Sequence, residues 1–315
     1  MKILYVVNSF RYPFVEGNIK QVFEIAEKFS KDHDVKILNF SNCKMSISNI
    51  DIIPFEEFSN EYFDVIHFYN PNIKILGKTF FFKAKKRIVT FGDGDVKSFI
   101  SYAPSFFLKI FRFDHCHLYS KQQVKNMKKY EIIPPLKPNF KPIGKKSKNP
   151  TLLFLHATVE HKGFTDSIDA FKIVNKKYPN AKFKIISFRN CFQFEKVPKN
   201  VELINTVVDP QVELSKAWIL LYPIRRNQST FAVPLLYMEA AQCNTPFIGT
   251  SLGSLRDYFN SDFLVEPKNP KSLAKKIIDI LDNYDKYLHK IKHGDHLNVK
   301  WENDDVISKL KKLYF

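Results

Sequence analysis

Short apolar runs that are typical of strands alternate with amphipathic stretches in the first half of this chain. The runs are Ile3 to Val7, Val35 to Phe40, Val65 to Phe68 and Arg87 to Phe91. This alternation indicates a parallel sheet with helices on both faces, because each crossover between parallel strands needs a connection of helical length. The first half is therefore predicted to be a doubly wound α/β domain.

A stretch rich in proline and lysine, PPLKPNFKPIGKKSKNP, interrupts the alternation at residues 134–150. Neither a helix nor a central strand accommodates so many prolines, so we interpret the stretch as an interdomain connection. The pattern then restarts, with predicted strands TLLFLHA, KFKIIS, WILLYP and PFIGT and helical spacing from Gly163 to Tyr178. We predict two facing doubly wound (Rossmann-like) domains, residues 1–140 and 141–297, with ligands bound beyond the carboxyl ends of the strands.

The composition indicates where such a chain works. Its 315 residues suit two domains, and its four cysteines are far apart with no CxxC pair, which argues against a disulfide framework or a zinc site. The first residues, MKILYVVNSF, lack the features of a signal peptide, and the most apolar stretch, Ser98 to Phe113, is interrupted by Lys109 and Arg112. We therefore expect a cytoplasmic protein that does not span a membrane.

A formal charge of +17 indicates attraction to anionic lipid, nucleic acid or phosphorylated substrates, although an AT-rich genome would produce the same bias. No nucleic-acid motif is present, so no nucleic-acid partner is expected. The segments KTFFFKAKKR and SYAPSFFLKIFRF place aromatic residues beside cations. This composition is typical of a peripheral contact with an anionic membrane, and it also fits buried helix cores with solvated lysine ends.

Taken in order, eight segments resemble the family-4 (group 1) retaining glycosyltransferases of the GT-B fold, from Met1 to about Tyr314. They are NSFRYPFVEGNIKQVFEIAEKF, DVIHFYNP, RIVTFGDGDV, HLYSKQQVKNM with EIIPP, LHATVEHKGFTDSIDAF, VPLLYMEAAQCNTPFIGTSLGSLRDY, FLVEPKNPKSLAKKI and VKWENDDVISKLKKLYF. The resemblance implies a nucleotide-diphosphate sugar as donor, with no metal or other cofactor. It also implies a glycan or lipid-linked acceptor in cell-surface glycan synthesis, and a terminal helix at 298–315 that packs back on the first domain.

The resemblance assigns most candidate residues to the donor. Lys162 occupies the position that binds the donor diphosphate, and Gly163 precedes a helix whose unpaired N–H groups also attract anions. Glu239 matches the carboxylate that holds the nucleotide ribose, since a carboxylate accepts from two adjacent hydroxyls. Leu235 lies in the same signature. Gly17 matches the first of two glycines that let the backbone approach the phosphate, and the second position is Asn18.

The catalytic candidates are less closely tied to a pattern. Asp95, in TFGDGDV, matches a carboxylate near the acceptor, and it also fits a solvated glycine-rich turn. His156 and His161 flank the Lys162 loop, where either could supply a proton or be structural. Arg225 and Arg226 follow a predicted strand, and a guanidinium suits a diphosphate, although a surface arginine pair is the alternative.

Three further positions depart from the family pattern. Gly92 replaces a histidine, Ala157 replaces an arginine, and Phe231 replaces the glutamate that contacts the transferred sugar. These losses support an alternative hypothesis, a catalytically silent GT-B relative that binds glycan or a partner transferase. The leading prediction remains a glycosyltransferase in which the departing phosphate assists removal of the acceptor proton.

Overall fold

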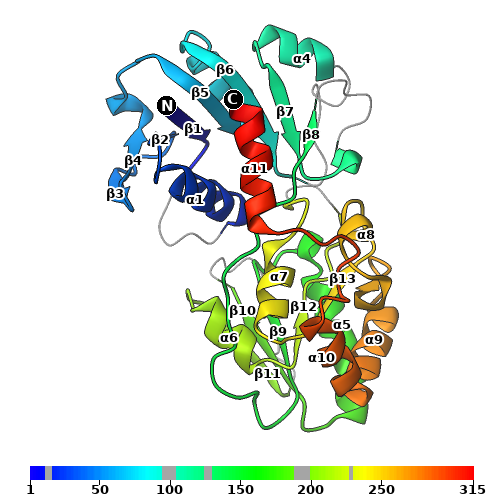
Figure 1. Ribbon diagram of the computed structural model, residues 1–315. Coiled ribbons are helices and arrows are strands. Elements are labelled where there is room, and N and C mark those ends of the chain that lie inside the picture. The colour runs from blue at the N-terminus through cyan, green and yellow to red at the C-terminus, as the bar shows by residue number, and fades with distance from the viewer. Residues whose placement is uncertain (11–15, 94–103, 124–129, 188–198, 227–229) are drawn as a thin grey trace. The chain divides into compact units, whose positions relative to one another are not determined.

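The protein, seen in a computed structural model, divides into two compact units (Figure 1). Unit 1 comprises residues 1–137, 228–233 and 301–315, and unit 2 comprises residues 138–227 and 234–300. The structure describes residues 1–10, 16–93, 104–123, 130–187, 199–226 and 230–315.

The described residues of unit 1 form an eight-stranded sheet in the order β3-β4-β2-β1-β5-β6-β7-β8, parallel except for the β3–β4 pair. The strands are β1 Lys2–Val7, β2 Asp34–Asn39, β3 Met45–Ile47, β4 Ile50–Pro54, β5 Phe63–Tyr69, β6 Ala84–Phe91, β7 His115–Leu118 and β8 Glu131–Ile132. The helices are α1 Gly17–Phe29, α2 Ile73–Lys78, α4 Pro104–Ile110 and α11 Asn303–Tyr314, with short 3₁₀ turns η1 Phe55–Glu57 and η2 Lys121–Gln123.

Unit 2 has a six-stranded, fully parallel sheet over its described residues, in the order β11-β10-β9-β12-β13-β14. The strands are β9 Thr151–Leu155, β10 Lys182–Ile186, β11 Val201–Ile204, β12 Ile219–Leu221, β13 Phe247–Thr250 and β14 Leu264–Val265. The helices are α5 Phe164–Lys177, α6 Pro210–Lys216, α7 Leu235–Gln242, α8 Leu255–Tyr258, α9 Pro270–Asp282 and α10 Tyr284–Lys292, with 3₁₀ turns η3 Glu160–Lys162 and η4 Ser261–Phe263. The predicted fold class, two doubly wound α/β domains, is confirmed.

The terminal helix α11 packs on unit 1, beside α1 (Figure 1). The rings of Phe29 in α1 and Tyr314 in α11 lie 4.9 Å apart, centre to centre. Just before the helix, the Trp301 indole N–H donates to the carbonyl of Pro135 at 2.8 Å. A buried indole needs such a partner, so this bond fixes where the chain re-enters unit 1.

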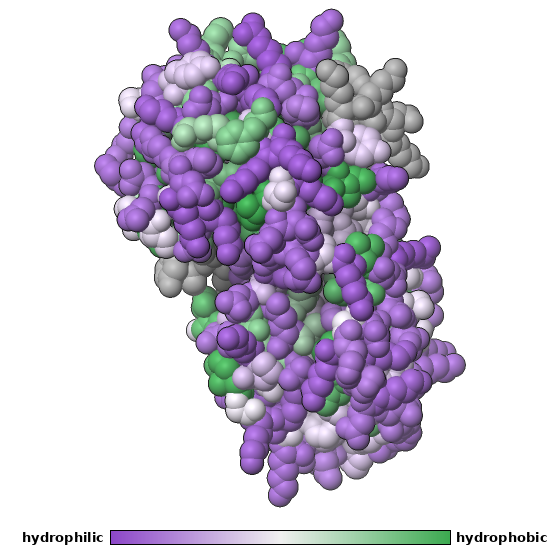
Figure 2. Space-filling view, viewed as in Figure 1, coloured by the Kyte–Doolittle hydropathy of each residue, from purple (hydrophilic) through white to green (hydrophobic). Residues whose placement is uncertain are grey.

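The surface agrees with the basic composition. Hydrophilic side chains cover most of the viewed face of each unit in Figure 2. Among the described residues, no helix has the length and apolar character needed to cross a membrane.

Candidate functional site

Most of the predicted site residues of unit 2 lie in turns at one edge of its sheet. Strands β9 and β12 pair in parallel, with Leu152 opposite Ile219, so their carboxyl ends share an edge. His156, His161 and Lys162 follow β9. Arg225 and Arg226 follow β12. The sheet thereby gathers a lysine, two arginines and two histidines where doubly wound folds bind ligands.

Lys162 ends the η3 turn and is buried, with 5% of its surface exposed. Its Nζ atom lies 5.9 Å from the centre of the Tyr222 ring. Gly163, next in the chain, has φ +78°, and a Cβ there would lie 1.8 Å from the Pro223 carbonyl oxygen. Only glycine fits, so the turn that carries Lys162 is pressed against the segment after β12.

Arg225 is held by carboxylates. Its Nε donates to Asp166 at 2.8 Å and its Nη2 donates to the same carboxylate at 2.7 Å, while Nη1 pairs with Glu160. The hydrogen bonds from Asp166, against partial burial, raise the pKa of Arg225. Its backbone N–H donates to the carbonyl of His161 at 2.9 Å. Arg225 therefore ties the segment after β12 to the Lys162 turn, whereas the neighbouring Arg226 is exposed.

The two candidate histidines differ in their surroundings. The His156 ring stacks on Tyr222 at 4.9 Å, and its Nδ1 accepts from the Ala157 N–H at 2.8 Å, so the proton of the neutral ring lies on Nε2. Burial, followed by the charges of Lys162 and Arg226, lowers the pKa of His161. His161 is therefore neutral at pH 7 and is able to accept a proton.

Helix α7 carries the last two donor candidates. Leu235 is its first residue, and the Glu239 carboxyl, one turn further on, is 2% exposed. The helix is held from behind by Tyr237, whose hydroxyl donates to the Tyr222 carbonyl at 2.7 Å. A Cβ at Gly249 would lie 2.6 Å from that hydroxyl, so β13 and α7 are in close contact.

In unit 1, Gly92 follows β6 and is held on both sides. Its N–H donates to Asn70 Oδ1 at 2.6 Å, and its carbonyl accepts from Ala232 at 2.7 Å. Asp93 forms an isolated antiparallel bridge with Phe231. Gly17 begins α1 at the same edge of the sheet. Asp95 lies outside the described residues.

Gln123 is a residue that sequence reasoning missed. Its Oε1 accepts from Tyr119 and Ser120 at 2.6 and 2.9 Å, and its Nε2 donates to the carbonyls of Phe91 and Asp93 at 2.6 and 2.8 Å. All four hydrogen-bonding positions of this buried amide are filled. The segment QQVKNM offers no sign of this, because the partners are backbone groups from distant strands.

No three His, Cys, Asp or Glu side chains gather as a metal site in the part of the chain that the structure describes. The expectation that no metal is required stays a prediction.

Two parallel-sheet domains, with a buried basic turn after the first strand of the second domain, define a glycosyltransferase of the GT-B class. The chain belongs to the group 1 glycosyl transferases, whose family model matches residues 137–295. The search of curated proteins found no match.

Solved structures share the fold over nearly the whole chain. HepE from Anabaena, in complex with UDP and glucose, has a TM-score of 0.71 at 12% identity and covers 99% of each chain. A glycosyltransferase from Rickettsia africae has a TM-score of 0.70 at 14% identity, covering 99% of this chain and 97% of its own. WaaG, a glycosyltransferase involved in lipopolysaccharide biosynthesis, has a TM-score of 0.66 at 15% identity, covering 92% and 94%.

Proposed function

We propose that this glycosyltransferase transfers a sugar from a nucleotide-diphosphate donor, with retention of anomeric configuration, to a glycan or lipid-linked acceptor in cell-surface glycan synthesis. The observation that carries the proposal is the buried Lys162 at the carboxyl edge of the unit 2 sheet, in a turn that only Gly163 permits. A buried ammonium is costly unless an anion meets it, and a diphosphate is the anion that this family transfers from.

In this proposal the unit 2 edge binds the donor. Lys162 and the exposed Arg226 contact the diphosphate and stabilise the negative charge that grows on it as the sugar departs. Arg225 acts through its ion pair with Asp166, which fixes the turn that carries Lys162. Glu239 accepts hydrogen bonds from the ribose hydroxyls, and Leu235 packs beside them. The cations replace a metal ion in this role, so we propose that none is required.

The acceptor proton leaves through the donor itself. In a retaining transfer the acceptor approaches from the side on which the phosphate departs, so a phosphate oxygen is within reach of the acceptor hydroxyl. The neutral His161 and the Nε2–H of His156 are then hydrogen-bonding groups near the phosphate and not the principal base. Asp95 stays a candidate for contact with the acceptor.

Calorimetric titration with UDP, GDP, ADP, TDP and CMP tests the donor site. Wild type is expected to bind one of them, and Lys162→Ala and Glu239→Ala should each weaken that binding about tenfold or more, because each removes a charge-assisted hydrogen bond. Lys176→Ala, on the exposed face of α5, is the matched control and should bind like wild type. Binding that survives both site substitutions would refute the donor assignment.

Retention is tested separately, once the donor is known. The anomeric configuration of the product, read by proton NMR immediately after transfer, should equal that of the donor. An inverted product would refute this part of the proposal without affecting the donor site.

The acceptor side rests on an apolar and basic surface of unit 1, which we propose contacts the cytoplasmic face of an anionic membrane. Phe81 is 81% exposed, Phe106 55% and Ile110 39%. Phe81 contacts Phe80, whose ring packs against Phe111, next to Ile110. Exposed aromatic rings beside lysines suit the interface of a lipid bilayer, where a lipid-linked acceptor would be met.

A further inference from the structure

Two asparagine side chains enclose the α-carbon of Gly92. A Cβ added at Gly92 would lie 2.0 Å from Asn18 Oδ1 and 3.0 Å from Asn70 Nδ2. Because no real Cβ tolerates a contact of 2.0 Å, any side chain at position 92 would displace the Asn18 amide. The glycine at position 92 and the asparagine at position 18 are therefore a matched pair, although both depart from the family pattern.

The same glycine orients both amides. The Gly92 N–H donates to Asn70 Oδ1 at 2.6 Å, which turns the oxygen inward and the Nδ2 outward. The Asn18 oxygen is buried against Gly92 without a hydrogen-bond partner among the described residues. Both side chains are half-buried, and the structure gives neither amide nitrogen a partner within its described part. Two neutral N–H₂ donors are thus left available.

These amides lie where a ligand is expected. Asn70 follows β5, Gly92 follows β6, and Asn18 is the second residue of α1, so all three lie at the carboxyl edge of the unit 1 sheet. Asn70 holds φ +46°, a left-handed conformation that few residues other than glycine adopt and that is common at functional sites. A polar residue is therefore kept there at a conformational cost.

The segment that contacts Gly92 leads directly into the donor helix. Ala232 donates to the Gly92 carbonyl, and α7, which carries Glu239, begins three residues later at Leu235. Phe231, bridged to Asp93, places a half-buried ring in the same cluster. Amide donors beside an aromatic ring match a sugar, whose hydroxyls accept hydrogen bonds and whose C–H faces pack on rings.

We propose that Gly92 orients Asn18 and Asn70 as a pair of neutral donors to hydroxyl oxygens of the transferred sugar, next to the Phe231 ring. The inference rests on the proposed function. Neutral amides discriminate a sugar hydroxyl from a phosphate, which draws the cations of unit 2 instead. Asn18 and Asn70 would touch substrate, whereas Gly92 is a positioning residue that acts through them.

Calorimetry with paired probes tests the two amides. Each variant is titrated with UDP and UDP-glucose, GDP and GDP-mannose, and UDP-N-acetylglucosamine. Asn18→Ala and Asn70→Asp should leave the affinity for the nucleotide unchanged and weaken the binding of the matching nucleotide sugar about fivefold each, the loss of one neutral hydrogen bond. Aspartate suits Asn70 because it tolerates the left-handed conformation and keeps the inward oxygen.

Asn72→Asp is the matched control, because it adds the same charge at the same edge. Asn72 caps α2 by accepting from Ile75, a role that aspartate fills equally well, so its nucleotide-sugar affinity should equal that of wild type. If Asn18→Ala and Asn70→Asp also behave like wild type, the inference is overturned while nucleotide binding still supports the proposed function. If wild type binds no nucleotide, the proposed function and this inference both fail.

A second set of variants tests the matched pair without any ligand. Gly92→Ala should lower the thermal midpoint by about 4 °C, because the new methyl group displaces Asn18. The double variant Gly92→Ala with Asn18→Gly should recover most of that loss, since the clash is removed. A Gly92→Ala protein with unchanged midpoint and unchanged sugar affinity would overturn the inference.

Discussion

Arg225 shows how one side chain decides the role of its neighbour. Asp166, which it pairs with, is 4% exposed, so its carboxylate depends on the two hydrogen bonds from the guanidinium. A guanidinium engaged in this way has few donors left for a phosphate. Arg226 has no such restraint described and is exposed at the same edge. The two adjacent arginines are therefore expected to fail differently when removed.

Arg225→Ala should lower the free energy of unfolding by about 2 to 3 kcal/mol, because it leaves the buried Asp166 carboxylate unpaired. Arg226→Ala should leave stability unchanged and weaken nucleotide binding about tenfold. Urea unfolding and calorimetry measure the two effects. Arg256→Ala removes an exposed surface pair and serves as the control for both. Unaltered stability in Arg225→Ala, together with lost nucleotide binding, would instead place Arg225 on the diphosphate.

The site residues divide by whether their signal is local in the sequence. Lys162, Gly163 and Glu239 could be predicted because each lies inside a continuous pattern of strand, turn and helix. Gln123 and Asn18 could not, because their roles depend on groups brought together by the fold: the carbonyls of Phe91 and Asp93 for one, and the α-carbon of Gly92 for the other. The missing histidine at position 92 looked like a loss, yet the structure shows that its space is filled.

At the scale of elements, helix α11 is joined to the unit 1 sheet by a buried chain of hydrogen bonds. His117 Nε2 lies 2.9 Å from the Ile133 carbonyl, so it carries the proton and Nδ1 accepts from Thr90 at 2.8 Å. Thr90 then accepts from His67 Nε2 at 2.6 Å, and His67 Nδ1 accepts from the Tyr314 hydroxyl at 2.6 Å. One backbone carbonyl thus sets both tautomers and requires both imidazoles to be neutral.

This chain predicts a loss of stability in weak acid. Burial lowers the pKa of His117 from 6.5 to about 4, although its bond to the Ile133 carbonyl opposes the shift, and burial likewise lowers the pKa of His67. Below about pH 6.5 the unfolded chain therefore binds protons that the folded chain does not. His117 alone should make the protein about 2 kcal/mol less stable at pH 5 than at pH 7.

Urea unfolding at both pH values checks this prediction. His117→Gln keeps one donor and one acceptor but no titration, so its stability should change less between pH 7 and pH 5 than that of wild type. His289→Gln, on helix α10 of unit 2, is the control and should keep the wild-type dependence. An identical pH dependence in wild type and His117→Gln would show that His117 is not the titrating group.

The elements themselves were largely predictable, since buried parallel strands appear as continuous apolar runs and their helices as amphipathic stretches. Strand β12 ends at Leu221, earlier than WILLYP indicates, because Pro223 offers no N–H to continue the ladder. The antiparallel β3–β4 pair was not predicted, since these strands are short and only partly buried. The polar chain to Tyr314 has no sequence signal, because its members come from four separate elements.

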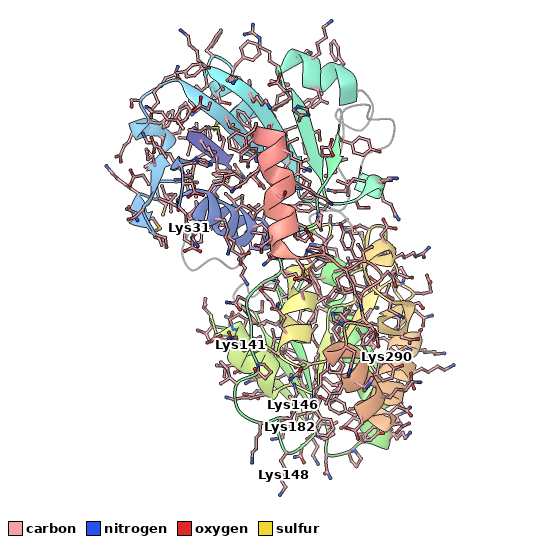
Figure 3. The ribbon with its side chains drawn as sticks, in the orientation of Figure 1. Lys31, Lys141, Lys146, Lys148, Lys182 and Lys290 are labelled. Carbon is pink, nitrogen blue, oxygen red and sulfur yellow. The ribbon has the colours of Figure 1, made fainter. Side chains whose placement is uncertain are left out.

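For the whole molecule, the charge of +17 is distributed over both units and over different environments. Figure 3 shows Lys141, Lys148 and Lys182 on unit 2, all exposed, and Lys31 on unit 1. Lys146 differs, because burial lowers its pKa to about 8 and its ammonium donates to Thr245. A membrane contact therefore cannot be inferred from net charge alone, and the exposed rings of unit 1 carry that argument.

Those rings make the membrane proposal testable. Wild type should sediment with vesicles of phosphatidylcholine and phosphatidylglycerol, and the double variant Phe81→Ser with Phe106→Ser should bind about tenfold more weakly, because two partly inserted rings are lost. Leu203→Ser with Val207→Ser removes two comparably exposed apolar side chains from unit 2, 43% and 53% exposed, and should bind like wild type. Binding should also fall as salt rises, since lysines near the rings contribute about 1 kcal/mol each at an anionic surface. If the unit 1 and unit 2 pairs weaken binding equally, or if phosphatidylcholine alone binds as well, the rings are not the contact and the basic surface acts without a defined membrane face.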